Sequence, residues 1–194
     1  MSQRSRVIAA NEYRRERWKN GAGWTREIIR VPDREDWDCR LSIAEIEQDS
    51  PFSLFPGIDR ELVLLHGNGL KLQFEDGESH DLHPPHDRLR FAGERKLAGE
   101  LLDGPTHDFN LMWHRDRIAA ELLHRPLVGP MLFFTEPGTI WAIHLLAGQA
   151  RFDEASDLPP LWAGDTALLV DGEQRQRYAL EGGGELLAIK LTHL

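Results

Sequence analysis

The chain has 194 residues, 41% of them hydrophobic, which suits one globular domain with a sizeable core or two small fused ones. Its formal net charge is −9 and its acidic residues are scattered, which argues against nucleic acid or an anionic membrane as partner but leaves a small anionic ligand open. The lone cysteine, Cys39, excludes an internal disulfide, and no signal-peptide or membrane-spanning run occurs, so we expect a cytoplasmic protein.

Short apolar runs, each interrupted by Gly, Pro, Asp or Asn, follow one another along most of the chain. Many short strands with regular turn signals are typical of all-β sandwiches and barrels. The best helical window is Arg115–Leu123, and Gly182–Gly184 is interpreted as a hairpin turn. The predicted strands are Trp24–Val31, Arg40–Ile46, Glu61–Leu65, Leu70–Phe74, Phe109–Trp113, Met131–Thr135, Ile140–Leu146, Ala167–Val170 and Glu185–Leu191.

A weak internal repeat runs through these strands, with partners spaced by roughly 70 to 80 residues and in the same order. Each copy reads as strand, Gly turn, strand, polar loop, aromatic-Ala-Gly-acid and strand, the pattern of a small cupin-type barrel. We therefore predict an all-β double cupin (bicupin), made of two β-barrel or jelly-roll modules with little helix. The first module is placed at residues 1–120 and the second at 121–194, completed by exchange with N-terminal strands. The matched segments are Leu64–Gly67 with Leu145–Gly148, Phe91–Glu94 with Trp162–Asp165, and Phe109–Trp113 with Leu186–Leu191.

The segment Asp49–Gly57 carries large apolar side chains on a backbone interrupted by prolines. Phe52 and Phe55 lie between Pro51 and Pro56, so this segment is neither regular helix nor central strand. Such a segment is expected to pack onto the core as a structured loop. It would then deliver Arg60 to the start of a buried strand.

Alternate residues of a strand share a face, which groups polar side chains in several predicted strands. Arg40 and Ser42 share one face of their strand, and Asn110 lies opposite Phe109. Guanidinium groups match carboxylates in bidentate fashion, so Arg40 and Arg60 suit an anion site. The alternative is that each arginine pairs with Glu27, Asp59 or Asp108 and holds the barrel closed.

Metal and nucleophile patterns are weak. Many cupins hold a metal through His-x-His, which does not occur in this sequence. The cluster of His80, His83 and His86 contains two prolines and is interpreted as a solvated turn. Cys39 lies between charged residues with no histidine nearby in sequence. We therefore predict no catalytic residue, no metal ligand and no cofactor.

Three motifs resemble those of the HutD/Ves family. They are Trp18–Ile28, then Arg40–Ile46 with Phe52–Arg60, and then Gly104–Met112. The resemblance covers most of the first half in the family's order, and the second half matches only in general character. The chain departs from the family pattern at Ser50, Trp24 and His114-Arg115, and the last of these changes bears on the role of a second arginine there.

The family resemblance implies a bicupin associated with bacterial histidine utilisation that binds a pathway intermediate such as urocanate or formylglutamate. On this basis the chain is expected to bind a small anionic metabolite and to modulate histidine catabolism without catalysis. The alternatives are a metal-dependent cupin enzyme acting on a small carboxylic acid and an interaction module with a vestigial pocket. A homodimer is left open. The expected ligand-binding residues are Asn20, Thr25, Glu27, Arg40, Ser42, Arg60 and Asn110.

Overall fold

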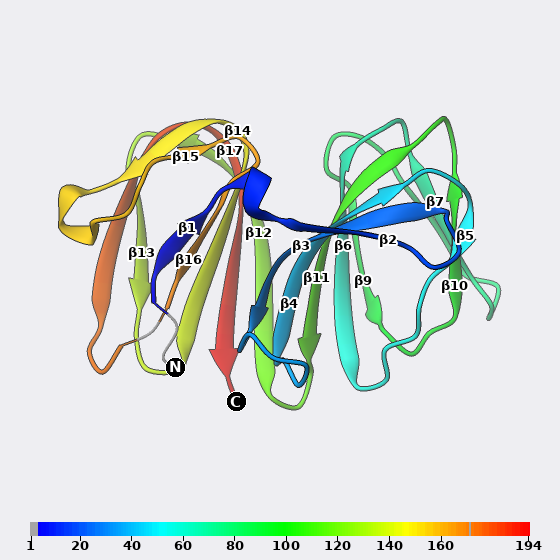
Figure 1. Ribbon diagram of the computed structural model, residues 1–194, viewed down its shortest axis with the longest axis horizontal. Helices are drawn as coiled ribbons and strands as arrows, with labels where there is room; N and C mark the ends of the chain where they lie inside the picture. The colour runs from blue at the N-terminus through cyan, green and yellow to red at the C-terminus, as the bar shows by residue number, and fades with distance from the viewer. Residues whose placement is uncertain (1–3, 171) are drawn as a thin grey trace. The chain divides into compact units, whose positions relative to one another are not determined.

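The computed structural model describes residues 4–170 and 172–194. The chain divides into two compact units. The first unit is Tyr13–Arg117, and the second unit is Ile118–Leu194 together with the segment that ends at Glu12. Each unit is built almost entirely from antiparallel strands (Figure 1).

The all-β class predicted from the sequence is confirmed. Across the described residues, helix is confined to two 3-10 turns, η1 (Ala10–Glu12) and η2 (Glu154–Ser156). Every predicted strand coincides with an observed one, except that Val170 lies just beyond the end of its strand, and several observed strands are longer than the predicted apolar runs. No helix in the described part of the chain is long and apolar enough to cross a membrane.

The helix predicted at Arg115–Leu123 is wrong. Strand β12 (Ile118–Val128) occupies most of that window and pairs along its whole length with β17 (Gln176–His193). Ile118 and Leu122 are buried in the strand, so tertiary pairing outweighs the helical preference of the Ala-Ala-Glu-Leu-Leu run.

The first unit has two sheets with an apolar cluster in its interior. The cluster includes Leu62 and Leu64 from the larger sheet and Leu70 and Leu72 from the smaller one. The larger sheet has the order β2 (Arg14–Arg17), β3 (Gly23–Val31), β4 (Cys39–Ile46), β11 (Thr106–His114), β6 (Ile58–His66) and β9 (Arg88–Ala92). The smaller sheet has the order β5 (Ser50–Pro51), β10 (Leu97–Leu101), β7 (Leu70–Phe74) and β8 (Ser79–Leu82).

The second unit contains one extensive sheet and its own apolar cluster, which includes Phe133, Leu145 and Leu180. Strand β1 (Arg6–Ile8) pairs with β16 (Thr166–Leu169), so the N-terminal strand joins the C-terminal sheet (Figure 1). The sheet order is β1, β16, β14 (Thr139–Phe152), β17 and β12, with β13 (Met131–Thr135) on β17 and β15 (Leu161–Trp162) on β14.

The glycine run Gly182–Gly184 is not a hairpin turn as predicted but lies inside strand β17. Gly182 and Gly184 have φ angles of 156° and 136°, and a Cβ on either would collide with backbone carbonyls of β14. The run therefore permits the close approach of β14 and β17. In sequence, glycines with this role look the same as glycines in a turn.

The repeated aromatic-Ala-Gly-acid segments form the same kind of turn in the two units. Each begins at the end of a short strand, β9 in the first unit and β15 in the second. Gly93 N donates to Ile58 O at 2.7 Å, and Gly164 N donates to Leu145 O at 2.7 Å. In both units, the turn is thus tied to a strand of the main sheet.

Candidate functional site

A cavity of about 560 Å³ lies within the first unit. This size falls in the range of small-molecule sites, which are mostly apolar with a few convergent polar groups. Its apolar lining comes from Trp18, Phe52, Phe55, Leu62 and Met112. Its polar lining includes six of the residues predicted from the sequence, namely Asn20, Thr25, Arg40, Ser42, Arg60 and Asn110.

The strand register brings the polar residues of the cavity together. On β11, Met112 is paired with Arg40 of β4 on one side and with Arg60 of β6 on the other. One step along the same face, Asn110 is paired with Ser42 and Leu62. Residues directly opposite in antiparallel strands share a face, so these side chains all point to the inside of the first unit.

Arg60 is the charged group most deeply placed in the cavity, with only 4% of its surface exposed. Its guanidinium carbon lies 5.2 Å from the ring centres of Phe52 and Phe91 and 5.5 Å from that of Phe55. Its Nε has no hydrogen-bond partner, and no described acidic residue forms an ion pair with it. Burial, and then the charge of Arg40, lower the pKa of Arg60 to about 10, so the group stays cationic at neutral pH.

The loop before β6 positions the rings that surround Arg60. Phe52 N donates to Leu97 O at 2.9 Å, and Phe55 N donates to Gly93 O at 2.8 Å. These bonds tie the proline-interrupted segment to β10 and to the turn after β9. The sequence-based expectation of a structured loop leading into a buried strand agrees with this arrangement.

The acids weighed as partners for Arg60 are engaged elsewhere. Asp59 accepts hydrogen bonds from Arg90 and Arg115, both at 3.0 Å. Glu27 accepts from Arg40 at 2.8 Å, and its carboxylate also pairs with Arg14 and Arg30. The arginine–acid pairing that was the alternative to an anion site therefore occurs at Arg40 and not at Arg60.

Glu27 is absent from the cavity lining and lies behind Arg40. Burial pushes the pKa of Glu27 upward, but the hydrogen bonds and charges of Arg30 and Arg40 outweigh it and hold the pKa below its usual value. The carboxylate is thus ionised and neutralises Arg40. Among the predicted site residues, Glu27 alone is outside the cavity lining, although it pairs in register with Ser42, and its carboxylate supports Arg40.

The uncharged site residues differ in whether their side-chain oxygens already have a hydrogen-bond partner within the protein. Thr25 Oγ1 accepts a hydrogen bond from Trp18 Nε1 at 2.8 Å, and Asn20 Oδ1 accepts one from Ala22 N at 3.0 Å. Both oxygens are therefore used in local structure. By contrast, Asn110 Oδ1 is buried and has no hydrogen-bond partner.

Asp108 was considered from the sequence as a possible arginine partner, and the structure gives it a different setting. It is fully buried, and its Oδ2 accepts a hydrogen bond from Thr106 Oγ1 at 2.7 Å, while Oδ1 has no partner. Burial raises the pKa of Asp108 to about 7. The period-2 pattern that links it to Asn110 is the sequence signal that could have found it.

The histidines of the first unit do not gather as a metal site there. His80 Nε2 lies 2.6 Å from Glu78 Oε1, and the backbone N of His83 donates to Asp87. Within the described residues of this unit, no three His, Cys, Asp or Glu side chains lie close enough together to share an ion. The cavity lining contains guanidinium, ammonium, hydroxyl and amide groups and the single carboxylate of Glu16, but no imidazole, a set that fits an anion better than a metal cation.

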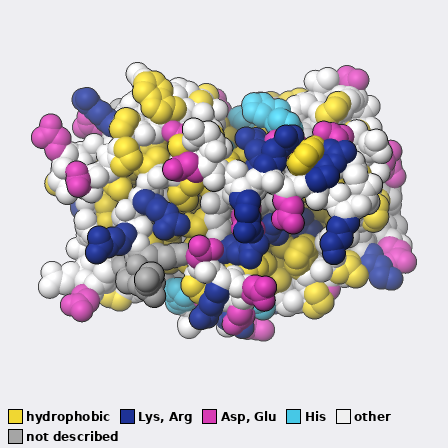
Figure 2. Space-filling model, viewed as in Figure 1, with side chains coloured by type: hydrophobic (Ala, Val, Ile, Leu, Met, Phe, Trp, Pro, Cys, Tyr) yellow, Lys and Arg dark blue, Asp and Glu magenta, His cyan; other side chains and the backbone are white. Residues whose placement is uncertain are grey.

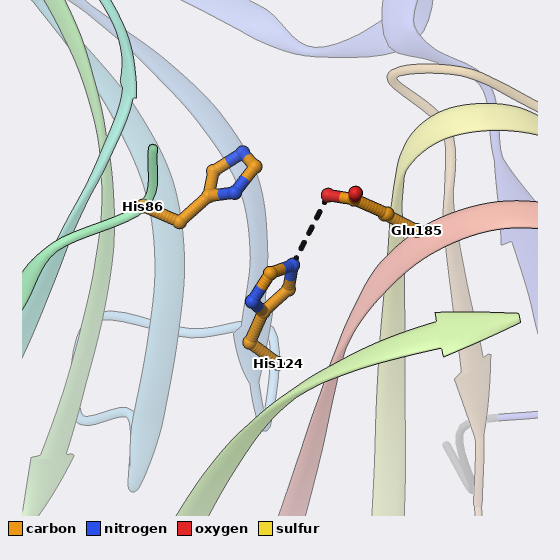
Figure 3. A group of neighbouring side chains, drawn as sticks. All are labelled: His86, His124 and Glu185. Atoms are coloured by element: carbon orange, nitrogen blue, oxygen red, sulfur yellow. Dashed lines mark hydrogen bonds and ion pairs between the residues drawn. The ribbon is translucent and has the colours of Figure 1, made fainter. Parts of the chain in front are cut away.

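His124 and Cys39 are two further side chains of types that can bind metals or act as nucleophiles. His124 Nε2 lies 3.2 Å from a carboxylate oxygen of Glu185 within the second unit, and Figure 3 also draws His86, which belongs to the first unit. Cys39 is fully buried, and burial raises the pKa of its thiol far above the usual value. Cys39 is therefore a core residue and not a thiolate nucleophile.

Ion pairs cover the outer surface. Figure 2 shows Lys and Arg side chains interspersed with Asp and Glu side chains on the face in view. Arg15 pairs with Glu45 at 2.6 Å, and Arg17, which lines the cavity, pairs with Glu47 at 2.6 Å. Exposed ion pairs of this kind contribute little stability, but they neutralise the charge of most surface arginines. Arg60 differs in that no described acid neutralises its charge.

Comparison with known proteins places the chain among bacterial relatives. The family model described as HutD matches residues 10–188. Protein Ves of Cronobacter sakazakii is 41% identical over 178 residues, which cover 91% of this chain and 93% of that protein. An uncharacterised 21.2 kDa protein in the hutC 3′ region of Pseudomonas putida is 38% identical over 118 residues, 60% of this chain and 62% of that protein. The name of the last relative places that protein in the region next to hutC.

Solved structures agree with the fold. HutD from Pseudomonas fluorescens SBW25 superposes with a TM-score of 0.84 at 28% identity, covering 98% of this chain and 99% of that one. Oxalate decarboxylase from Lactobacillus farciminis superposes with a TM-score of 0.67 at 10% identity, covering 100% of this chain and 87% of that one. The second likeness concerns the cupin-type fold alone.

Proposed function

The chain belongs to the HutD family, and from that premise we propose that the cavity of its first unit binds a small anionic carboxylate of histidine utilisation. The observation that carries the proposal is Arg60, a guanidinium buried at the cavity wall without an acidic partner among the described residues. A buried uncompensated charge is costly, and a ligand carboxylate would supply the missing counter-charge.

The shape and chemistry of the cavity favour a ligand with a carboxylate and a compact planar or polar body. Phe52 and Phe55 present ring surface next to Arg60, and Asn110 adds an amide. Arg40 is neutralised by Glu27, so Arg60 supplies a buried positive charge that no described acid compensates. Urocanate and formylglutamate, the acids implied by the family resemblance, both meet this description.

The proposed role is binding and not catalysis: occupation of the cavity by the metabolite would modulate histidine catabolism in the cytoplasm. The link to a histidine utilisation locus supports this assignment. So does the composition of the cavity wall, where hydrogen-bond donors and rings surround the uncompensated Arg60.

Calorimetric titration of the folded protein with urocanate and with formylglutamate tests the proposal. We expect binding of at least one acid, and loss of that binding in Arg60→Ala. Arg34→Ala is the matched control, because Arg34 is an exposed arginine of the same unit outside the cavity lining. Absence of heat with either acid, on protein shown to be folded by circular dichroism, would overturn the proposal.

A further inference from the structure

Strand β11 carries a row of polar side chains on its inward face that continues beyond the cavity. Asn110 lines the cavity, and Asp108 and Thr106 follow at alternate positions of the same strand. Alternate residues of a strand are about 7 Å apart at Cα, so neighbouring side chains of the row are within reach of one another. Asp108 is thus the next group behind the amide of the proposed binding site.

Two buried oxygens in this row lack partners. They are Asp108 Oδ1 and Asn110 Oδ1. Thr106 gives its single hydroxyl hydrogen to the other oxygen of Asp108. Leaving both acceptors unpaired is costly in a buried setting, and two acceptors can satisfy each other only if one of them carries a proton.

The surroundings of Asp108 favour its neutral form. At its level β4 presents Ala44 and β6 presents Leu64, both buried in the apolar cluster that also includes Leu72 of the facing sheet. The charged groups on the inward faces of β4 and β6 are Arg40 and Arg60, whose register partner on β11 is Met112, four residues further along. Burial is the dominant cause of the raised pKa of Asp108, and no charged neighbour contributes to it.

We propose that protonated Asp108 donates a hydrogen bond to Asn110 Oδ1 and thereby turns the Asn110 amide so that its NH₂ group faces the cavity as an anion donor. When Asp108 loses its proton to solvent, its carboxylate accepts from the Asn110 NH₂ instead. The amide then presents its oxygen to the cavity, where it repels a carboxylate. Asp108 is a positioning residue in this account, and the inference rests on the proposed anion-binding function.

Binding of formylglutamate measured across pH tests the inference. The carboxylates of this probe stay ionised between about pH 6 and pH 8.5, so the probe itself does not titrate. We expect the affinity of the unaltered protein to fall at least about fivefold over this range. In Asp108→Asn the dependence should disappear, because the Asn NH₂ donates permanently to Asn110 Oδ1. Retention of the wild-type pH slope in Asp108→Asn would overturn the inference.

Glu61→Gln is the matched control. Glu61 is a buried acid whose pKa is also raised, chiefly by burial, but it lies on β6 between Arg60 and Leu62 and points away from the cavity. Its replacement removes a buried carboxyl without touching the row on β11. The variant should keep the wild-type dependence of affinity on pH, and loss of that dependence would contradict a specific role for Asp108.

A measurement on the ligand-free protein separates this inference from the proposed function. The side-chain NH₂ signals of Asn110 in a ¹H–¹⁵N spectrum should shift with pH with the midpoint at which the Asp108 carboxyl carbon titrates, and should stop shifting in Asp108→Asn. If formylglutamate fails to bind but these signals titrate together, the coupling stands and the ligand assignment falls. If the Asn110 signals do not follow Asp108, the coupling itself is wrong.

Discussion

Replacing Asp108 with Asn should raise the free energy of unfolding at alkaline pH and flatten its dependence on pH. Burial raises the pKa of Asp108 in the folded chain to about 7, against 3.8 for an ordinary aspartate. The unfolded chain therefore releases this proton at lower pH, so its contribution to stability is fully present below about pH 4 and is lost as pH rises to about 7. Roughly three pKa units at about 1.4 kcal/mol each give a loss of about 4 kcal/mol.

Urea unfolding of both proteins at a series of pH values measures this effect, because the difference between them cancels the other titrating groups. We expect a small difference near pH 4 and a difference of a few kcal/mol in favour of Asp108→Asn near about pH 8. Glu35→Gln, which changes an exposed acid, is the control and should show no such trend. A flat difference between wild type and Asp108→Asn, or one of opposite sign, would refute the burial argument.

Three further outcomes are expected. Arg60→Ala should weaken binding of the carboxylate by about 1.5 to 3 kcal/mol, and Arg60→Lys should recover only part of it, while the melting temperature of the ligand-free protein should not fall appreciably in either variant. Calorimetry and thermal melts on the same samples check this, and a large loss of ligand-free stability with unchanged affinity would remove Arg60 from the site. Gly184→Ala should destabilise the second unit by at least about 2 kcal/mol, because its φ of 136° and the carbonyl of Ala147 exclude a side chain. Gly183→Ala is its control, since a Cβ there meets open space, and equal melting temperatures for the two variants would contradict the close-approach argument. Simultaneous replacement of His80, His83 and His86 by Gln should leave carboxylate binding unchanged. It should also leave the metal content, measured by elemental analysis, unchanged. Loss of both would show that a metal site was missed.

Much of the fold follows from local sequence pattern. Alternation in runs such as Arg40–Ile46 and Leu70–Phe74 marks strands, and it also decides which residues share a face. That is why six of the seven expected site residues line one cavity, although they come from several strands and a loop. The seventh, Glu27, pairs in register with Ser42, but its carboxylate forms ion pairs with Arg14, Arg30 and Arg40 and is not part of the cavity lining. Sequence alternation alone does not show which arginines a carboxylate will pair with.

The features that sequence reasoning missed depend on long-range pairing. The run from Ile118 to Leu123 has helical composition, but a partner strand that begins beyond residue 170 pairs with it as sheet. The setting of Asp108 likewise depends on Ala44 and Leu64, which become its neighbours only through the register of three strands. Sequence identifies the acid, whereas burial and the raised pKa come from residues more than forty positions away.

The different pairing of the two arginines would explain how an acidic protein could bind the small anion proposed for its cavity. Arg40 and Arg60 flank the same residue of β11, yet Glu27 neutralises Arg40 and no described acid neutralises Arg60. The net charge of −9 repels polyanions at long range, but a small carboxylate that enters the cavity meets a desolvated guanidinium at short range. The ligand-free protein bears the cost of burying that charge, so the same carboxylate that fills the cavity should also stabilise the fold.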